Sequence, residues 1–248
     1  MFYKELHDAF LSLLRDKKLL DEKIIIKTRI LNSKEAIGNP DRKDFPLLKG
    51  KEVLMSATFL NKEGQAYTDA PSEFSGKVKD IVKLPLDDIR NRALFIASLN
   101  AVMRHVYPDL TTIHCKDNEP EECSAEIVKH VRQLNPERVG IVGLQPAILE
   151  AIAGEFGPEN IQCIDRDEDY IGQSKFNVPI KWGDTDNLEE LCKASDVILA
   201  TGSTVVNGSI SDILQLAQKY GHPVYFYGTT VAGTAALMKL NRLCFRSK

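Results

Sequence analysis

The sequence predicts an α/β protein in which a small α+β domain is followed by a doubly wound parallel sheet. In the second half of the 248 residues, apolar runs of strand length alternate with amphipathic helical patterns, which is typical of βαβ units. Three of these runs end in turns rich in glycine or hydroxyl residues. In the first half, strand-length runs follow one another after a helical pattern, as in α+β domains. We therefore expect two domains, over residues 1–110 and 111–248.

A strand, a tight turn and a helix are predicted where residues 139–155 read VGIVGLQPAILEAIAGE. The apolar run stops at Gly143, and Pro146 suits a first helical turn because the N–H that proline lacks would have no helical partner there. A second apolar run, 161–164, ends in Asp165, roughly twenty residues after the turn, where dinucleotide-binding folds keep the acid that binds a ribose. The unit is typical of the first βαβ of a Rossmann-like domain.

The glycine pattern of this turn is not that of a complete dinucleotide site. Gly140, Gly143 and Pro146 form G-x-x-G-x-x-P, whereas the full fingerprint is G-x-G-x-x-G. A glycine that only lets the strand turn into the helix would explain Gly143. Free N–H groups and the positive end of the helix would instead make an anion site. We expect Gly143 and Gln145 to contact a ligand, because two further loops should reach the same edge of the sheet.

The first domain is expected to contain a helix with an apolar face, three strands and a second, buried helix. Their predicted ranges are 2–20 for the first helix, 24–31, 53–60 and 66–68 for the strands, and 87–107 for the second helix. Loop 33–50 is long for a small domain, so we favour a functional role for it. The turn-rich segment 68–76 either faces the same cleft as loop 33–50 or is an ordinary surface connection, and both interpretations stay open.

One polar residue, Asn100, lies on the wide apolar face of the helix predicted at 87–107. A buried amide must find hydrogen-bond partners or cost about 1–3 kcal/mol. Asn100 therefore either ties down a neighbouring loop or points into a ligand cleft. We include it among the candidate ligand-binding residues.

A polar segment at 108–120 is predicted to link the two domains, and an amphipathic helix follows at 121–134. His114 and Cys115 are adjacent in this linker, but a metal site would need two further ligands that the sequence does not place. The five cysteines lack C-x-x-C spacing, which argues against a disulfide framework and against a zinc knuckle. The acidic run 167–169 is typical of a solvated loop.

Two more glycine- and hydroxyl-rich turns follow the apolar runs 197–200 and 223–227. We expect Asn187 to cap one helix, and Ser209 with Asp212 to form a capping box for a helix at 210–220. Main-chain N–H and hydroxyl groups in such turns can bind a carboxylate or a phosphate, and doubly wound sheets bind ligands at this edge. The candidate ligand-binding residues are Gly143, Gln145, Asp165, Thr201, Gly202, Ser203, Thr204, Asn207, Gly228, Thr229, Thr230 and Asn100.

The composition, 43% apolar and 27% charged with a formal net charge of -3, is that of a soluble globular protein. The sequence has no stripe of basic residues of the kind that binds nucleic acid. The N-terminus has no apolar signal core, and no window approaches the roughly eighteen apolar residues of a membrane span. We therefore expect a cytoplasmic protein without nucleic-acid or membrane partners, and leave a homo-oligomer open.

Three sequence elements resemble a known family: VGIVGLQPA, ATGSTVVNGS and the pair Asn100-Ala101 in a buried helix. They are similar to the two-domain family described as putative heavy-metal chelation proteins. The resemblance implies an enolase-N-terminal-like α+β module joined to a Rossmann-like module, with a ligand cleft between them. In the last turn the family tends to have Gly-Pro, whereas this chain has Gly228-Thr229-Thr230, so that part of the match is looser.

The first functional hypothesis is the binding or delivery of a small anionic ligand, such as a metal chelate, in this cleft. The sequence shows no clustered His and Cys set that would hold a bare soft metal, so a heavy metal would arrive in an organic chelate. The alternative is a nucleotide- or S-adenosylmethionine-dependent enzyme with Gly143 at the cofactor and Asp165 on a ribose. A non-catalytic subunit that binds protein is a third hypothesis. No catalytic residue can be identified from spacing.

Overall fold

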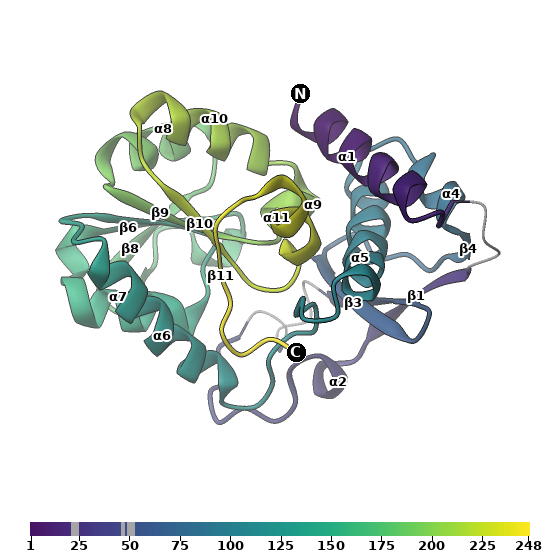
Figure 1. Cartoon of the computed structure of the whole chain (residues 1–248). Coiled ribbons are helices and arrows are strands. Elements are labelled where there is room, and N and C mark those ends of the chain that lie inside the picture. The colour runs from purple at the N-terminus through teal and green to yellow at the C-terminus, as the bar shows by residue number, and fades with distance from the viewer. Residues whose placement is uncertain (21–24, 46–47, 49–52) are drawn as a thin grey trace.

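A computed structural model describes residues 1–20, 25–45, 48 and 53–248. It shows an antiparallel sheet with helices, followed by a mostly parallel sheet with helices on both faces (Figure 1). We refer to α1 through α5 as the N-terminal module and to α6 through β11 as the C-terminal module. The predicted α/β class and the order of the two sheets are confirmed, whereas the domain boundary at residue 110 stays a prediction.

The N-terminal module consists of a four-stranded antiparallel sheet in the order β3-β2-β1-β4 and the helices packed on it. Its elements are α1 (Phe2–Asp16), β1 (Ile25–Leu31), α2 (Ser33–Ile37), β2 (Val53–Phe59), β3 (Lys62–Thr68), β4 (Ser75–Lys77), α4 (Val78–Val82) and α5 (Ile89–Val106). The three predicted strands are present. Residue 24, predicted in the first strand, lies outside the described residues, as do 46, 47, 49 and 50 of the predicted loop.

The third strand is longer than the sequence predicted, because β2 and β3 form a tight hairpin. Leu60 and Asn61 make the two-residue turn, with φ angles of 46° and 62°. Turns of this kind usually contain asparagine and glycine, and leucine rarely adopts a positive φ. The hairpin therefore carries no strong sequence signal.

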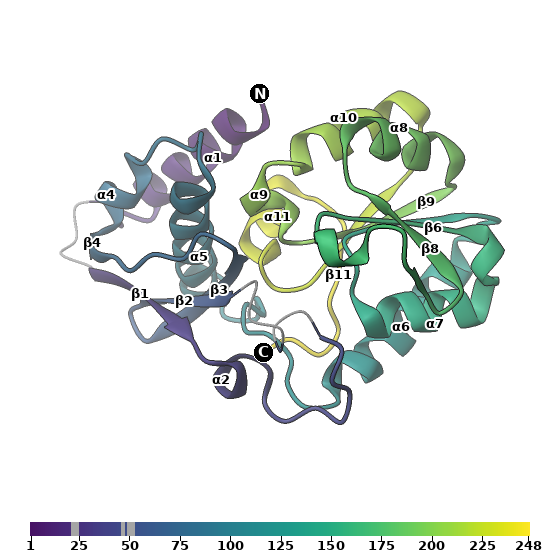
Figure 2. The ribbon, with the colours of Figure 1, turned by 180° about the vertical axis from the view of Figure 1, so that it is seen from behind.

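Helix α5 lies directly on β3. A Cβ atom on Gly64 would stand 2.1 Å from the main-chain nitrogen of Ala101 and 2.5 Å from the carbonyl carbon of Asn100. Every residue of α5 from Arg92 to Met103 is buried. The deep burial predicted for this helix is confirmed, because the sheet covers one of its sides and α1 and the C-terminal module cover the others (Figures 1 and 2).

The C-terminal module consists of a seven-stranded sheet in the order β11-β10-β9-β5-β6-β8-β7, in which only β7 pairs antiparallel. Its strands are β5 (Val139–Val142), β6 (Ile161–Asp165), β7 (Ser174–Lys175), β8 (Val178–Trp182), β9 (Val197–Thr201), β10 (Val224–Tyr227) and β11 (Arg242–Leu243). If the six parallel strands are numbered 1 to 6 along the chain, their order across the sheet from β8 to β11 is 3-2-1-4-5-6. This is the order of doubly wound dinucleotide-binding sheets, whose ligand crevice lies between strands 1 and 4, here β5 and β9.

Helices cover both faces of this sheet, and Figure 2 shows α8 and α10 on one side and α6 and α7 on the other. The helices are α6 (Glu119–Gln133), α7 (Pro146–Phe156), α8 (Thr185–Ala194), α9 (Thr204–Asn207), α10 (Ile210–Tyr220) and α11 (Ala232–Met238), with short 3-10 turns η1 (Pro158–Asn160) and η2 (Glu168–Tyr170). The expected helix at 210–220 is confirmed. The helix expected from 121 begins at Glu119.

Two predicted helix caps are wrong. Asp184, not Asn187, caps α8: its Oδ1 accepts the N–H of Asn187 at 2.8 Å, so the helix begins earlier than predicted. Ser209 precedes α10 but makes no side-chain cap, because its hydroxyl donates to Oδ1 of Asn207 at 2.8 Å. In each case a neighbouring side-chain oxygen offers a competing acceptor, and such local alternatives are common for these residue types.

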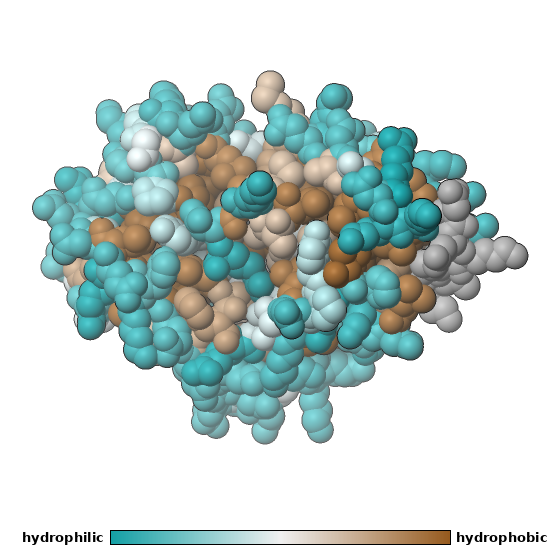
Figure 3. Space-filling model, viewed as in Figure 1, coloured by the Kyte–Doolittle hydropathy of each residue, from teal (hydrophilic) through white to brown (hydrophobic). Residues whose placement is uncertain are grey.

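The two modules share a continuous hydrophobic core and several buried hydrogen bonds. The hydroxyl of Tyr3 donates to the carbonyl of Val205 at 2.8 Å, and Nε of buried Arg92 donates to the carbonyl of Val206 at 2.6 Å. Figure 3, in the same view as Figure 1, shows hydrophilic residues around most of the rim of the molecule and hydrophobic residues gathered across its middle. Among the described residues, no helix is both long and apolar enough to span a membrane.

Replacing Gly64 with alanine is expected to destabilise the fold by about 2 kcal/mol or more, because the added methyl would press into the backbone of α5. The matched control is Gly154→Ala in α7, where a Cβ meets nothing within 4 Å. Alanine should stabilise this helix by about 0.5 kcal/mol. Urea unfolding measures both changes, and equal stabilities of the two variants would contradict the close packing of α5 on β3.

Candidate functional site

A cavity of about 520 Å³ lies between the carboxyl ends of β5, β6, β9 and β10 and the N-terminal module. This volume is within the range of small-molecule sites. All of the predicted ligand-binding residues except Asn100 line the cavity. The three turns identified in the sequence therefore do come together with room between them, and their contact with a ligand stays a prediction.

The first turn, at the end of β5, uses most of its N–H groups within the protein. The N–H of Gly143 donates to the carbonyl of Ile164 at 2.8 Å, and the N–H of Leu144 donates to Oδ2 of Asp165. Oε1 of Gln145 accepts the N–H of Ile148 at 2.6 Å and so caps α7. This turn is therefore less available to an anion than its sequence suggested.

Gly143 is required at this turn for two reasons. Its φ of 91° lies in the region that favours glycine, and a Cβ atom would stand 2.4 Å from Cγ2 of Thr201 in the second turn. The hydroxyl of Tyr227 also donates to the carbonyl of Gly143. Gly143 thus lets the first and second turns approach each other at the bottom of the crevice.

Asp165, at the end of β6, is a half-buried carboxylate held by main-chain donors. Besides Leu144, the N–H of Asp167 donates to its Oδ1 at 2.7 Å. Burial raises the pKa of Asp165, and the hydrogen bonds from these N–H groups oppose that shift. Each carboxylate oxygen accepts one of these main-chain hydrogen bonds and has a second lone pair that can face the cavity.

The second turn packs tightly against the third. The N–H of Gly202 donates to the carbonyl of Tyr227 at 2.8 Å, and a Cβ atom on Gly202 would stand 2.9 Å from that same oxygen. The hydroxyl of Thr204 donates to the carbonyl of Thr201 at 2.7 Å, so it closes the turn. Oγ of Ser203 lies 3.2 Å from Oγ1 of Thr201, and this hydroxyl pair lines the cavity. Asn207 lines it as well, and its Oδ1 holds Ser209.

Asn100 lies behind the third turn, not in the cavity wall. Its side-chain nitrogen donates to the carbonyls of Gln65 at 2.7 Å, Thr229 at 3.2 Å and Thr230 at 3.0 Å. Its Oδ1 accepts the N–H of Gly233 at 2.7 Å. Of the two roles that the sequence left open, Asn100 has the first: it ties a loop of the C-terminal module to β3.

These contacts set the direction of the peptide groups in the third turn. Nε of Arg242 donates to the carbonyl of Gly228 at 2.9 Å, while Asn100 binds the carbonyls of Thr229 and Thr230. The N–H of a trans peptide points away from the carbonyl of the same peptide. The N–H groups of Thr229 and Thr230 therefore point away from these two side chains, and neither has an acceptor among the described residues.

The side chains of the third turn differ in their roles. Oγ1 of Thr230 accepts the N–H of Tyr67 at 3.0 Å, which joins the turn to β3. Oγ1 of Thr229 is buried and has no hydrogen-bond partner in the described part of the chain. A buried hydroxyl without a partner is costly unless a water or a ligand satisfies it. Thr229 is thus a residue of the cavity lining whose buried hydroxyl has no partner among the described residues.

The cavity lining also contains His114, which the sequence placed in the linker and offered only as part of an incomplete metal site with Cys115. His114 lines the cavity, its ring makes an edge contact with Tyr67 at 5.5 Å, and its Nδ1 is buried without a partner in the described ranges. Burial lowers the pKa of His114 to about 4. Its imidazole is therefore neutral at physiological pH. The polar linker gave no signal for this position, because only the packing of the modules creates it.

Four acidic side chains line the cavity, three of them at or after the end of β6 and one directly after β3. Asp69, Asp165, Asp167 and Glu168 line it, whereas Arg166 is the only Lys or Arg among the lining residues described. Nε of Arg166 donates to the carbonyl of Gly183 at 3.0 Å. The loop after β6, expected to be simply solvated, thus contributes to the cavity wall. The cavity combines the carboxylates at the end of β6 with the N–H and hydroxyl donors of the third turn.

The described residues contain no group of three or more His, Cys, Asp or Glu side chains arranged to hold a metal ion. A bare metal ion would therefore find no complete set of protein ligands at these positions. The arrangement fits a guest that brings some of its own polar groups.

Comparisons with known proteins agree with this architecture. Residues 126–240 match the DUF364 family model, described as "putative heavy-metal chelation". Two crystal structures of DUF364 proteins of unknown function have a similar fold. The protein from Pyrococcus horikoshii is 15% identical with a TM-score of 0.61, covering 96% of this chain and 83% of that one. The protein from Desulfitobacterium hafniense is 10% identical with a TM-score of 0.58, covering 95% and 82%. No curated protein matches the sequence significantly. The resemblance predicted from the sequence is confirmed.

The neutral state of His114 should make folding stability depend on pH. Its folded pKa of about 4 lies below the ordinary value of 6.5, so the unfolded chain takes up a proton first as the pH falls. The stabilisation is present above pH 6.5 and is lost toward pH 4. Between pH 7 and 4.5 the protein should lose about 2 kcal/mol more stability than His114→Gln. Urea titrations at each pH measure this difference, and parallel pH curves would contradict a buried neutral imidazole.

Proposed function

We propose that the cavity between the modules binds a small organic anion that carries a metal ion. The observation that carries the proposal is the two-sided wall: main-chain and hydroxyl donors in the third turn, and carboxylates around the loop after β6. A metal chelate presents both kinds of group, because its free carboxylate oxygens accept hydrogen bonds and its metal centre is positive. The family description for residues 126–240, which refers to heavy-metal chelation, supports the same class of ligand.

In this proposal the N–H groups of Thr229 and Thr230 and the hydroxyl of Thr229 donate to the carboxylate of the guest. Asp165 and Asp167 lie on the side that faces the metal centre. Because the described side chains hold no complete metal site, the organic ligand would keep most of the coordination positions. The protein would then recognise the complex and not the bare ion, which suits binding or delivery. No residue is assigned a catalytic role.

The alternative is a nucleotide- or S-adenosylmethionine-dependent enzyme, and the strand order with Asp165 at the end of β6 favours it. The acidic lining disfavours a pyrophosphate, since four carboxylates face it against one guanidinium. S-adenosylmethionine carries a sulfonium cation and suits this lining better. The main-chain hydrogen bonds to Asp165 leave only its second lone pairs for a ribose. We therefore place the chelate first.

Two further parts of the proposal concern the fold and the location. We propose that the N-terminal module is of the enolase-N-terminal type and that the C-terminal one is Rossmann-like, in line with the antiparallel and parallel sheets. We also propose a cytoplasmic location, because all five cysteines are free thiols.

A thermal-shift panel tests the ligand class. It should contain ferric, nickel and copper citrate, citrate alone, each metal alone, S-adenosylmethionine, ATP and NAD. A true ligand raises the melting temperature by mass action, by several degrees at a hundredfold excess over its dissociation constant. We expect a shift with at least one metal citrate that exceeds the shifts with its components. Stabilisation by S-adenosylmethionine or nucleotides alone would reject the chelate proposal in favour of the enzyme.

Thr229→Val tests the role of the hydroxyl in the third turn. Valine keeps the shape and removes one donor, so the affinity for the stabilising ligand should fall roughly tenfold while the fold stays intact. Thr234→Val is the matched control, because its hydroxyl is also buried without a described partner but does not line the cavity. Isothermal titration calorimetry measures both affinities. A loss in both variants, or in neither, would remove Thr229 from the site.

A further inference from the structure

His114 brings to the cavity lining a ring nitrogen that no described residue binds. The side chain is half-buried, and its Nδ1 is enclosed by protein without a hydrogen-bond partner in the described part of the chain. Nε2 likewise makes no hydrogen bond with the described residues, but it is not among the enclosed atoms. Nε2 is therefore the nitrogen that a guest can reach, and a polar atom in such a wall fixes the orientation of a ligand.

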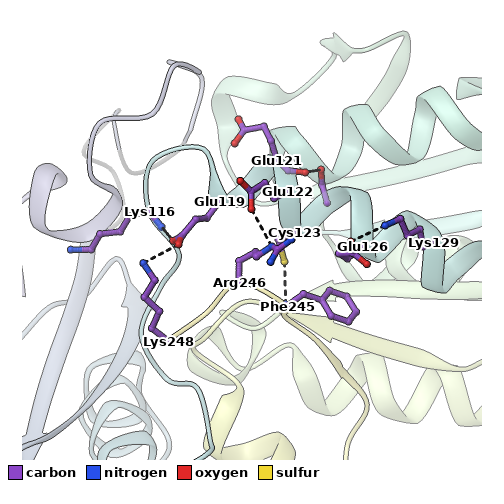
Figure 4. Close-up of polar contacts among 11 residues, drawn as sticks. Lys116, Glu119, Glu121, Glu122, Cys123, Glu126, Lys129, Phe245, Arg246 and Lys248 are labelled. Atoms are coloured by element: carbon purple, nitrogen blue, oxygen red, sulfur yellow. Dashed lines mark hydrogen bonds and ion pairs between the residues drawn. The ribbon is translucent and has the colours of Figure 1, made fainter.

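The main chain around His114 is fixed before any guest binds. Its own N–H donates to Oε1 of Gln65 at 2.7 Å. Just after it, the N–H of Lys116 donates to Oε2 of Glu119 at 2.8 Å, and Nζ of Lys248 lies 2.9 Å from Oε1 of the same carboxylate. Figure 4 shows both contacts, with the C-terminal segment (residues 244–248) beside α6. The imidazole is thus preorganised, which lowers the entropic cost of binding.

Strand β3 holds both His114 and the third turn of the cavity. The ring of Tyr67 meets the ring of His114 edge-on, with 5.5 Å between centroids, while its N–H donates to Oγ1 of Thr230 at 3.0 Å. Gln65 binds His114 through its side chain, and its carbonyl accepts from Asn100 at 2.7 Å. The same amide of Asn100 also binds the carbonyl of Thr230 at 3.0 Å. One guest can therefore contact the imidazole and the turn together.

The imidazole suits a neutral polar group better than a second carboxylate. Burial lowers the pKa of His114 to about 4, so the ring carries no charge that would attract an anion at neutral pH. A neutral imidazole has one N–H and one lone pair, and either can stand at Nε2. A hydroxyl group both donates and accepts, so it pairs with either form, whereas an ionised carboxylate only accepts. Asp69, which lines the cavity directly after β3, would also repel a second carboxylate.

We propose that Nε2 of His114 binds a hydroxyl group of the guest while the third turn binds its carboxylate, so that the cavity selects hydroxycarboxylates. This inference rests on the proposed function, because it assigns the organic part of the chelate. Polycarboxylates without a hydroxyl group would leave the imidazole unpaired in the closed complex. Sites that bind a hydroxyl group through buried polar atoms reject such analogues for this reason.

Citrate and tricarballylate, which is citrate without its hydroxyl group, are the probes. Each is applied to the full chain at pH 7, alone and with an equimolar amount of nickel, and isothermal titration calorimetry measures the affinities. We expect the ratio of the two affinities, citrate over tricarballylate, to be roughly tenfold lower in His114→Phe than in the wild type, as the loss of one hydrogen bond predicts. Comparing this ratio between the two proteins removes the different stabilities of the two nickel complexes.

Two further variants separate the hydrogen bond from other effects. His114→Gln should keep part of the ratio, because its amide can donate or accept near the position of Nε2. His130→Phe is the matched control and should leave the ratio unchanged. His130 also has a buried nitrogen without a described partner and an edge contact, with Tyr225 at 5.0 Å, but it does not line the cavity. Circular dichroism and urea unfolding show whether each variant is folded.

The outcomes distinguish this inference from the proposed function. An unchanged ratio in folded His114→Phe, or an equal fall in His130→Phe, would overturn the role of His114, while tighter binding of nickel citrate than of citrate alone would still support the chelate. If citrate binds equally well with and without nickel but the ratio depends on His114, the metal part of the proposed function fails and the hydroxyl contact stands. Binding of neither acid in either form would overturn both.

Discussion

The buried amide of Asn100 is the interaction on which the site depends. Its two N–H hydrogens are shared among three carbonyl groups and its oxygen accepts one N–H group, and these partners come from β3, the third turn and the start of α11. Each of these main-chain groups would cost about 1–3 kcal/mol if it were buried without a partner. The amide can reach them because Gly64 lets α5 lie against the strand. A hydrogen-bonded amide thus decides how the two modules meet and which way the peptides of the third turn face.

The direction of those peptides gives the cavity its chemistry. Carbonyls held by Asn100 and Arg242 leave N–H groups on the opposite side, beside the buried hydroxyl of Thr229. The carboxylates after β6 lie on another part of the wall, so the cavity is electrostatically two-sided. Arg242 binds both this turn and the C-terminal segment, since it also donates to Oγ of Ser247 at 3.1 Å. The junction of the C-terminal segment with α6 is therefore connected to the cavity by one guanidinium group.

Much of the fold followed from local sequence patterns. The strand at 139–142 and the helix at 210–220 were predicted with their observed bounds, although the capping box expected at the start of the helix does not form. The gathering of three turns at one edge also followed, since parallel strands place their carboxyl ends together. For Asn100, helical spacing predicted burial but left the choice between a loop tie and a ligand contact open.

Other features depend on contacts between distant segments, which no local pattern encodes. His114 enters the cavity wall only because the modules close around the linker. The start of α8 is capped by Asp184, whose Oδ1 accepts the N–H of Asn187. At the start of α10 the hydroxyl of Ser209 donates to Asn207 and so forms no cap. Phe245 donates its N–H to Sγ of Cys123 because of the path of the C-terminal segment along α6. Composition and residue spacing therefore could not predict these contacts.

A crystal structure of the protein with a bound ferric citrate complex would test the central claim most directly, because anomalous scattering locates the iron. We expect iron in the cavity, on the side of Asp165 and Asp167, with a citrate carboxylate accepting from the N–H groups of Thr229 and Thr230. Iron or citrate bound outside the cavity, or a third turn whose carbonyl groups face the ligand, would contradict it.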